Sequence, residues 1–151
     1  MRRPAALAAL TLATAACQEA PTSPYARPAG PAPSGLPATL RITPSTGTPL
    51  AGPAIVADGD SLVASAEYDA SGCLDYTAVA GTVNSTVVVT IIETTPSPPQ
   101  MCALVKRTAV FHAVVRPAPR GAYAVVLRQR LEWPSDGPVE RERARGSVTL
   151  P

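Results

Sequence analysis

The sequence has 151 residues, of which 46% are hydrophobic, 16% are charged and only 4% are aromatic. That length suits one domain with appendages, and 18 prolines disfavour long helices, because proline lacks an N–H and clashes with the preceding turn. The formal charge of +2 comes from the N-terminus, since residues 36–151 hold ten basic and ten acidic side chains. Net charge therefore gives no argument for nucleic-acid binding.

Residues 1–16 have the layout of a secretory signal peptide. Arg2 and Arg3 form a short positive region, 5–13 is an apolar run, and small residues then lead to Cys17. The apolar run is far shorter than the ~20 residues that a membrane-spanning helix needs. We therefore expect export from the cytoplasm without a transmembrane anchor.

The stretch Leu12-Ala13-Thr14-Ala15-Ala16-Cys17 resembles the lipobox of bacterial lipoproteins. Ala15 and Ala16 match the small residues of that signal, and Thr14 stands where the family usually has Leu. The resemblance implies cleavage before Cys17 and a lipid anchor, with palmitate-type acyl chains, on its thiol. It places the protein in the cell envelope, held to a membrane by its N-terminal lipid, and Gln18 favours the outer membrane over another periplasmic face in a Gram-negative cell. The alternative is ordinary secretion with a free Cys17.

The three cysteines fit this interpretation, because an odd number in an oxidising compartment leaves one unpaired. If Cys17 carries the lipid, Cys73 and Cys102 remain, and we expect a disulfide between them. Closing a loop of roughly 30 residues would stabilise the domain by about 3–4 kcal/mol. A metal site is the alternative, and it needs more ligands than two distant cysteines supply.

Residues 17–37 hold the lipid-attachment cysteine followed by a linker rich in proline and alanine. Such a composition stays extended and solvated. At ~3.1 Å per residue, 20 residues reach roughly 60 Å at most. We interpret this segment as a disordered tether between the membrane and the domain.

Residues 38–151 are predicted to form a single all-β domain. Short runs rich in Val, Ile, Thr and Tyr alternate with Pro, Gly, Asp and Ser. The predicted strands are 39–43, 61–67, 76–83, 86–93, 105–115, 122–132 and 143–150. About seven short strands with frequent turns indicate one antiparallel β-sandwich.

The alternation is clearest in 122–132, where Tyr123, Val125, Leu127 and Leu131 fall on one face. Arg128, Arg130 and Glu132 fall on the other face, as in a half-buried strand. The segment 139–145 fits a short helix after Pro138, but the Glu-Arg-Glu-Arg alternation favours a strand.

The stretch Pro119-Arg120-Gly121-Ala122-Tyr123-Ala124-Val125 resembles a turn and strand entry of immunoglobulin-like and fibronectin-like domains. The resemblance implies an immunoglobulin-like sandwich. Immunoglobulin domains place a Trp between their paired cysteines, whereas Trp133 follows both cysteines here. The resemblance therefore concerns the architecture and not membership of that family.

No pattern for catalysis, a cofactor or a metal stands out. His112 is the only histidine, and it lies inside a predicted apolar strand, which favours a structural role. Asp58-Gly59-Asp60 has too few oxygen ligands nearby for calcium and is better explained as a tight turn. Asn84-Ser85-Thr86 is interpreted as a hairpin turn.

The charges are unevenly distributed along the domain. Residues 38–104 hold one basic and six acidic side chains, whereas 105–151 hold nine basic and four acidic. The two halves either neutralise each other or leave a basic face on the last strands that meets an anionic polymer or an acidic envelope protein. The residues of that face are Lys106, Arg107, Arg128, Arg130, Arg141, Arg143 and Arg145.

The sequence thus predicts a lipid-anchored envelope protein whose domain is a non-catalytic interaction or structural module. The alternative is a head that binds carbohydrate or an anionic ligand, through the basic face or through an exposed Trp133 beside Pro134. We expect neither an enzyme nor a nucleic-acid-binding protein.

Overall fold

The computed structural model describes residues 34–48, 50, 54–96, 106–132 and 137–151. The predicted signal peptide, Cys17, most of the predicted linker, Cys102 and Trp133 lie outside this part of the chain. The described residues are all-β. Their strands are β1 (Ser34–Leu36), β2 (Ala38–Pro44), β3 (Ile55–Asp58), β4 (Ser61–Ser71), β5 (Asp75–Val83), β6 (Thr86–Thr94), β7 (Lys106–Val115), β8 (Gly121–Leu131) and β9 (Val139–Leu150).

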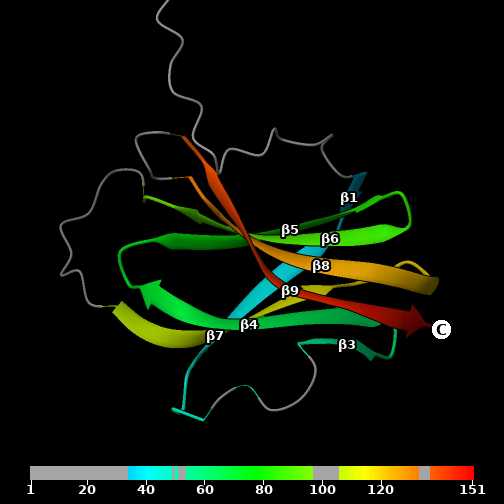
Figure 1. Cartoon of the computed structure of the whole chain (residues 1–151), viewed down its shortest axis with the longest axis horizontal. Helices are drawn as coiled ribbons and strands as arrows, with labels where there is room; N and C mark the ends of the chain where they lie inside the picture. The colour runs from blue at the N-terminus through cyan, green and yellow to red at the C-terminus, as the bar shows by residue number, and fades with distance from the viewer. Residues whose placement is uncertain (1–33, 49, 51–53, 97–105, 133–136) are drawn as a thin grey trace, which may run out of the picture.

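The strands form two sheets that lie face to face as an open sandwich (Figure 1). The first sheet has the order β1-β5-β6-β8-β9, and the second sheet has the order β2-β7-β4-β3. Every pair of neighbours is antiparallel except β6 and β8, which run parallel. The expectation of a purely antiparallel sandwich is therefore wrong for one pair.

The parallel pair follows from where the chain places β7. The chain leaves the first sheet after β6, runs back along the second sheet as β7, and returns to the first sheet as β8. Two reversals of direction leave β8 pointing the same way as β6. This strand order does not confirm the immunoglobulin-like arrangement that the 119–125 stretch implies.

All seven predicted strands are present, and the structure adds two short ones. The predicted ranges correspond to β2 and to β4 through β9, and the ambiguous segment 139–145 lies within strand β9. The additions are β1 and β3, which have three and four residues. Strand β1 lies in the range that we predicted as linker, so 34–36 form part of the sheet structure.

Two turns predicted from the sequence are confirmed. Asn84 and Ser85 both have positive φ, at 47° and 61°, and join β5 to β6 as a two-residue hairpin turn. Gly59, at φ 58°, lies in the tight turn between β3 and β4.

The core lies between the sheets and is built mainly from small aliphatic side chains. On β6 the buried residues alternate at Val87, Val89 and Ile91, as expected for a strand with one face on the core. One aromatic group lies at the end where β4 meets β5. The ring of Tyr68 stacks on Phe111 with centroids 4.0 Å apart, and Tyr76 tilts against Phe111 at 5.2 Å.

Candidate functional site

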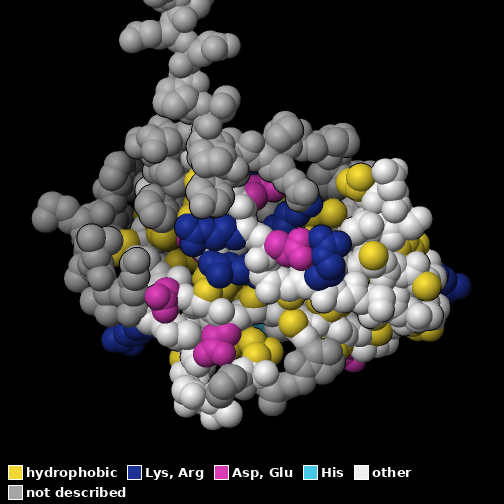
Figure 2. All heavy atoms as spheres, in the orientation of Figure 1, with side chains coloured by type: hydrophobic (Ala, Val, Ile, Leu, Met, Phe, Trp, Pro, Cys, Tyr) yellow, Lys and Arg dark blue, Asp and Glu magenta, His cyan; other side chains and the backbone are white. Residues whose placement is uncertain are grey.

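Three residues of the predicted basic face, Arg128, Arg130 and Arg145, lie on the outer side of the β8–β9 hairpin. Strands β8 and β9 pair with each other, and Arg128 and Arg130 lie opposite Glu142 and Glu140. Arg128 Nη1 is 3.4 Å from Glu140 Oε2, and Arg130 Nε is 3.0 Å from Glu132 Oε1. Figure 2 shows basic and acidic side chains intermixed in the middle of the view, where β9 crosses in front of the sheets in Figure 1.

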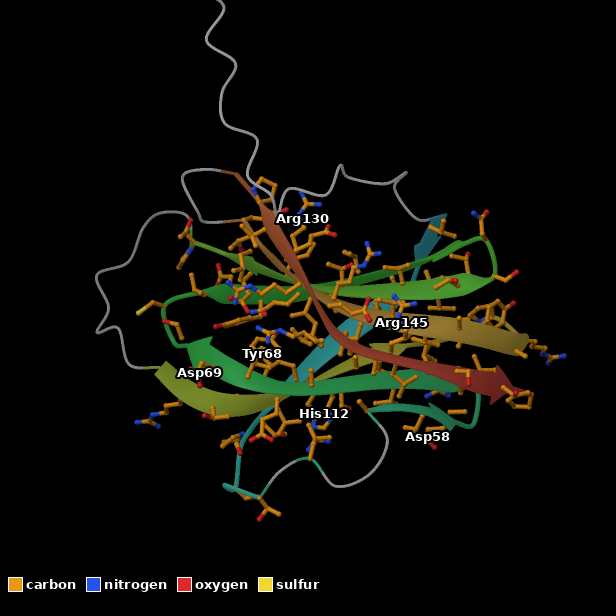
Figure 3. All side chains as sticks on the ribbon, in the orientation of Figure 1. Asp58, Tyr68, Asp69, His112, Arg130 and Arg145 are labelled. Atoms are coloured by element: carbon orange, nitrogen blue, oxygen red, sulfur yellow. The ribbon has the colours of Figure 1, made fainter. Side chains whose placement is uncertain are left out.

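Arg145 is paired as well. Its Nε and Nη2 donate to the two carboxylate oxygens of Glu142 at 2.9 and 2.7 Å. This bidentate hydrogen bond raises the pKa of Arg145, so the guanidinium stays charged. Arg130 and Arg145 lie along this hairpin in Figure 3. The outer side is therefore a mixed surface, and its arginines are largely neutralised by neighbouring glutamates.

A β-bulge produces this pairing. From Gly121 to Leu127 the register continues regularly, and between Leu127 and Arg128 it shifts by one residue, so that Arg143 is the extra residue of β9. In the unshifted register Arg128 would lie opposite Arg143, and Arg130 opposite Arg141. Like charges directly opposite each other are destabilising, so the bulge replaces two arginine–arginine pairs with arginine–glutamate pairs.

The bulge also turns Arg143 toward the core, where it joins a buried polar cluster. Its Nε donates to Gln129 Oε1 at 2.6 Å, and the Gln129 amide donates to Glu93. Glu93 and Gln129 are 3% and 4% exposed. The sequence placed Arg143 on the basic face, and the structure corrects this, because the bulge reverses the direction of its side chain.

Tyr68 lies between this cluster and the aromatic group. The Arg143 guanidinium carbon is 4.8 Å from the centroid of its ring, a cation–π contact. Burial, followed by the charge of Glu93, raises the pKa of Tyr68 far above its usual range. Its buried hydroxyl has no hydrogen-bond partner among the described residues. The cluster forms a polar end of the core, and the side chain of Arg143 belongs to this cluster.

His112 projects from β7 to the outer side of the second sheet, away from Tyr68 (Figure 3). Its Nδ1 is 2.9 Å from Ser65 Oγ on β4, and its Nε2 is 3.4 Å from Thr43 Oγ1 on β2. Burial, and then the charge of Arg41, lowers the pKa of His112, so the ring is neutral at pH 7. Its partners are two hydroxyls from the flanking strands, an arrangement that links three strands.

A groove of about 1300 Å³ lies at the end of the sandwich. It lies between β2 and the turn that joins β4 to β5. Apolar side chains line much of it, and Glu67, Arg107 and Thr108 supply polar groups. The apolar residues are Ile42, Pro44, Ala70, Leu74, Tyr76 and Ala109. Ile42 is 42% exposed there.

This groove has no signal in the sequence. Ile42 alternates with polar neighbours as a core residue would, and nothing in that pattern shows that the space beside it is open. Its lining comes from β2, β4, β5 and β7, which meet only in the folded chain. The predicted site residues Arg128, Arg130, Arg141, Arg143 and Arg145 are not part of the described lining.

Of the predicted disulfide, only Cys73 lies in the described residues, in the turn after β4 and in the groove lining. The segment that carries Cys102 leaves β6 at Thr94, opposite Asp75, and rejoins β7 at Lys106, opposite Ser71. Both ends of that segment therefore flank Cys73, and the pairing remains a prediction.

These features define an all-β, two-sheet, sandwich-like domain with an apolar groove at one end. Comparison with protein-family models, with curated proteins and with solved structures finds no match to this chain. Within the described ranges, no helix has the length and hydropathy to cross a membrane. No group of three His, Cys, Asp or Glu side chains among the same residues is arranged to hold a metal ion.

Proposed function

We propose that this chain is an exported, lipid-anchored protein of the bacterial cell envelope, and that its sandwich is a non-catalytic interaction module. The groove between β2 and the β4–β5 turn is its binding surface. The lipid on Cys17 holds the chain to a membrane, and the proline-rich segment holds the domain away from it.

The N-terminus supports the anchoring. The positive start, the short apolar run and the small residues before Cys17 are the signals of lipoprotein export. Lipid on Cys17 also leaves an even number of cysteines for the exported domain.

The groove is the observation that supports the proposed role in interaction. A concave, largely apolar surface with a few polar groups is the usual form of a binding site, and Ile42 is exposed in it. The arginines of the β8–β9 hairpin support binding less, because Arg128, Arg130 and Arg145 have carboxylate partners.

Two measurements test this proposal in cells that produce the full chain. Alkyne palmitate should label the protein, and Cys17→Ser should remove the label. A photo-crosslinking amino acid at Ile42 should give a crosslinked product, whereas the same group at Val56, an exposed position of β3 outside the groove, should not. Labelling that survives Cys17→Ser, or equal crosslinking at both positions, contradicts the proposal.

The second candidate is binding of an anionic or carbohydrate ligand through the arginines or Trp133. The exposed Arg107 and Arg141 are described side chains of the predicted basic face that favour it. Affinity of the full chain for polyphosphate that falls with added salt, and falls further in Arg141→Glu, supports this candidate.

A further inference from the structure

Strand β5 is paired along only part of one edge among the described residues. Strand β1 pairs only with 80–82 of β5, because the chain turns at Pro37 and continues in the second sheet as β2. Residues 75–79 of β5 therefore have β6 on one side and, in the part of the chain that the structure describes, no strand on the other. Among the described residues, no strand pairs with the backbone N–H and C=O groups of this half of the edge.

The outward side chains of this stretch are accessible to solvent. Asp75, Thr77 and Val79 point outward and are exposed, and Val79 is 45% exposed. Tyr76 and Ala78 alternate with them and pack against the core. A strand added here would continue the line of β1.

The other described edges carry the features that prevent strand addition. Strand β9 has a bulge and a row of charges, β3 has only four residues, and β2 holds Arg41 and ends in Pro44. Residues 75–79 hold no proline, bulge or basic side chain. Natural proteins guard such an edge unless it is used, so this one is suited to a partner.

The groove lies directly beside this edge. Tyr76 belongs both to the free stretch of β5 and to the groove lining, and β2, which supplies Ile42 and Pro44, lies against β5. A strand paired with 75–79 would point every second side chain toward Ile42 and Tyr76. Backbone pairing and side-chain pockets are thus available together, as strand addition requires.

We propose that an extended segment of a partner polypeptide binds as an additional strand on 75–79 of β5 and inserts alternate apolar side chains into the groove. This deepens the proposed function and rests on it for the role of the groove. Asp75 at the end of the edge selects a Lys or Arg opposite it, since opposite charges stabilise cross-strand pairs. The partner is therefore a segment of alternating apolar residues that ends in a basic residue.

The test uses the full-length chain in detergent and a fluorescent peptide, acetyl-Lys-Val-Thr-Val-Thr-Val-Lys-amide. The peptide has a lysine at each end, so that a lysine can lie near Asp75 whether the peptide runs parallel or antiparallel to β5. Binding is measured by fluorescence anisotropy, and amide hydrogen exchange shows where the peptide lies. We expect saturable binding together with slower exchange in 75–79.

Two methylated peptides separate strand pairing from nonspecific apolar contact. In a strand, alternate N–H groups point to the same edge. Methylating the three valine nitrogens blocks one edge, and methylating the two threonine nitrogens blocks the other. One of these peptides should bind on the order of tenfold more weakly, and the other should bind like the parent. Equal effects of the two methylations would overturn the proposal.

Variants of the chain locate the site. Ile42→Lys should weaken binding on the order of tenfold, because a charge replaces the exposed apolar wall of the groove. Val56→Lys is the matched control, an exposed valine outside the groove lining, and should bind as the parent does. Thermal unfolding checks that both variants are folded.

The outcomes also separate this inference from the proposed function. Absence of peptide binding, while crosslinking at Ile42 persists in cells, overturns strand addition and leaves the groove as a binding surface for another ligand. A dimer in sedimentation experiments that the peptide does not dissociate, with the exchange of 75–79 already slow, means that a second copy holds the edge, and it also overturns the proposal.

Discussion

At the scale of single residues, the role of an arginine here depends on its burial and on its neighbours in the folded sheet. Arg141 and Arg143 are two apart in sequence, yet Arg141 is exposed while Arg143 is half-buried against Tyr68 and Gln129. A count of basic residues along the sequence does not distinguish Arg141 from Arg143. Arg141 lies opposite Gln129 and Arg143 is the extra residue of the bulge, and both positions depend on the pairing with β8, which no local pattern reveals.

Removing the Arg143 guanidinium should therefore destabilise the domain. Arg143→Met leaves the buried Gln129 oxygen without its donor, and a buried unsatisfied group costs about 1–3 kcal/mol. Urea unfolding should show a loss of this size. Arg141→Met is the control and should change the free energy of unfolding by less than about 0.5 kcal/mol. Similar losses in the two variants would contradict the inward role of Arg143.

His112 should make the free energy of unfolding of the domain depend on pH, with a sign that follows from its pKa. Its folded-state pKa lies below the ordinary value of 6.5, because burial and Arg41 disfavour the charged ring. The unfolded chain therefore takes up the proton first. The contribution of His112 to the free energy of unfolding is complete above pH 6.5, and it is lost as the pH falls through the lower folded-state pKa of the ring.

Urea unfolding between pH 7.5 and 4.5 measures this contribution. The parent protein should lose more stability over that range than His112→Gln, in which the remaining dependence comes from carboxylates. Parallel curves for the two proteins would show that His112 contributes nothing to the pH dependence.

At the scale of elements, alternation and turn residues suffice to predict most strands. The run 122–132 shows its buried face because apolar and charged residues alternate in it, and Val125, Leu127 and Leu131 are indeed buried. Strands β1 and β3 are too short to show a period, since they have three and four residues. Strand partners are not encoded locally, so the parallel β6–β8 pair and the groove beside β2 could not be predicted.

The turn between β5 and β6 offers a stabilising substitution. Ser85 has a φ of 61°, a conformation in which a Cβ is unfavourable, and two-residue hairpins with two positive φ values favour Asn-Gly. Ser85→Gly should raise the free energy of unfolding by about 0.5–1 kcal/mol. Thermal unfolding measures it, and Ser147→Gly in the regular part of β9, an exposed strand position, should lower stability instead. A loss of stability in Ser85→Gly would contradict the conformation of the turn.

At the scale of the whole molecule, the sandwich is open and needs its ends held together. The segment that joins β6 to β7 passes from one sheet to the other, and its ends lie opposite Asp75 and Ser71. Cys73 lies between those two residues in sequence. A crosslink from this turn to the segment would tie the two sheets together at the end where the groove opens, in addition to restricting the unfolded chain.

We therefore predict that Cys73 and Cys102 form a disulfide, and that losing it destabilises the domain. The chain-entropy model gives about 3–4 kcal/mol for a loop of this length. Mass spectrometry without reduction should find one linked peptide, and Cys73→Ala with Cys102→Ala should unfold at lower urea by an amount that corresponds to that loss. Cys17→Ser is the control, because Cys17 belongs to the anchor and should leave the urea midpoint unchanged. Two free thiols in the exported domain, or an unchanged midpoint in the double variant, would show that packing between the sheets is sufficient without the crosslink.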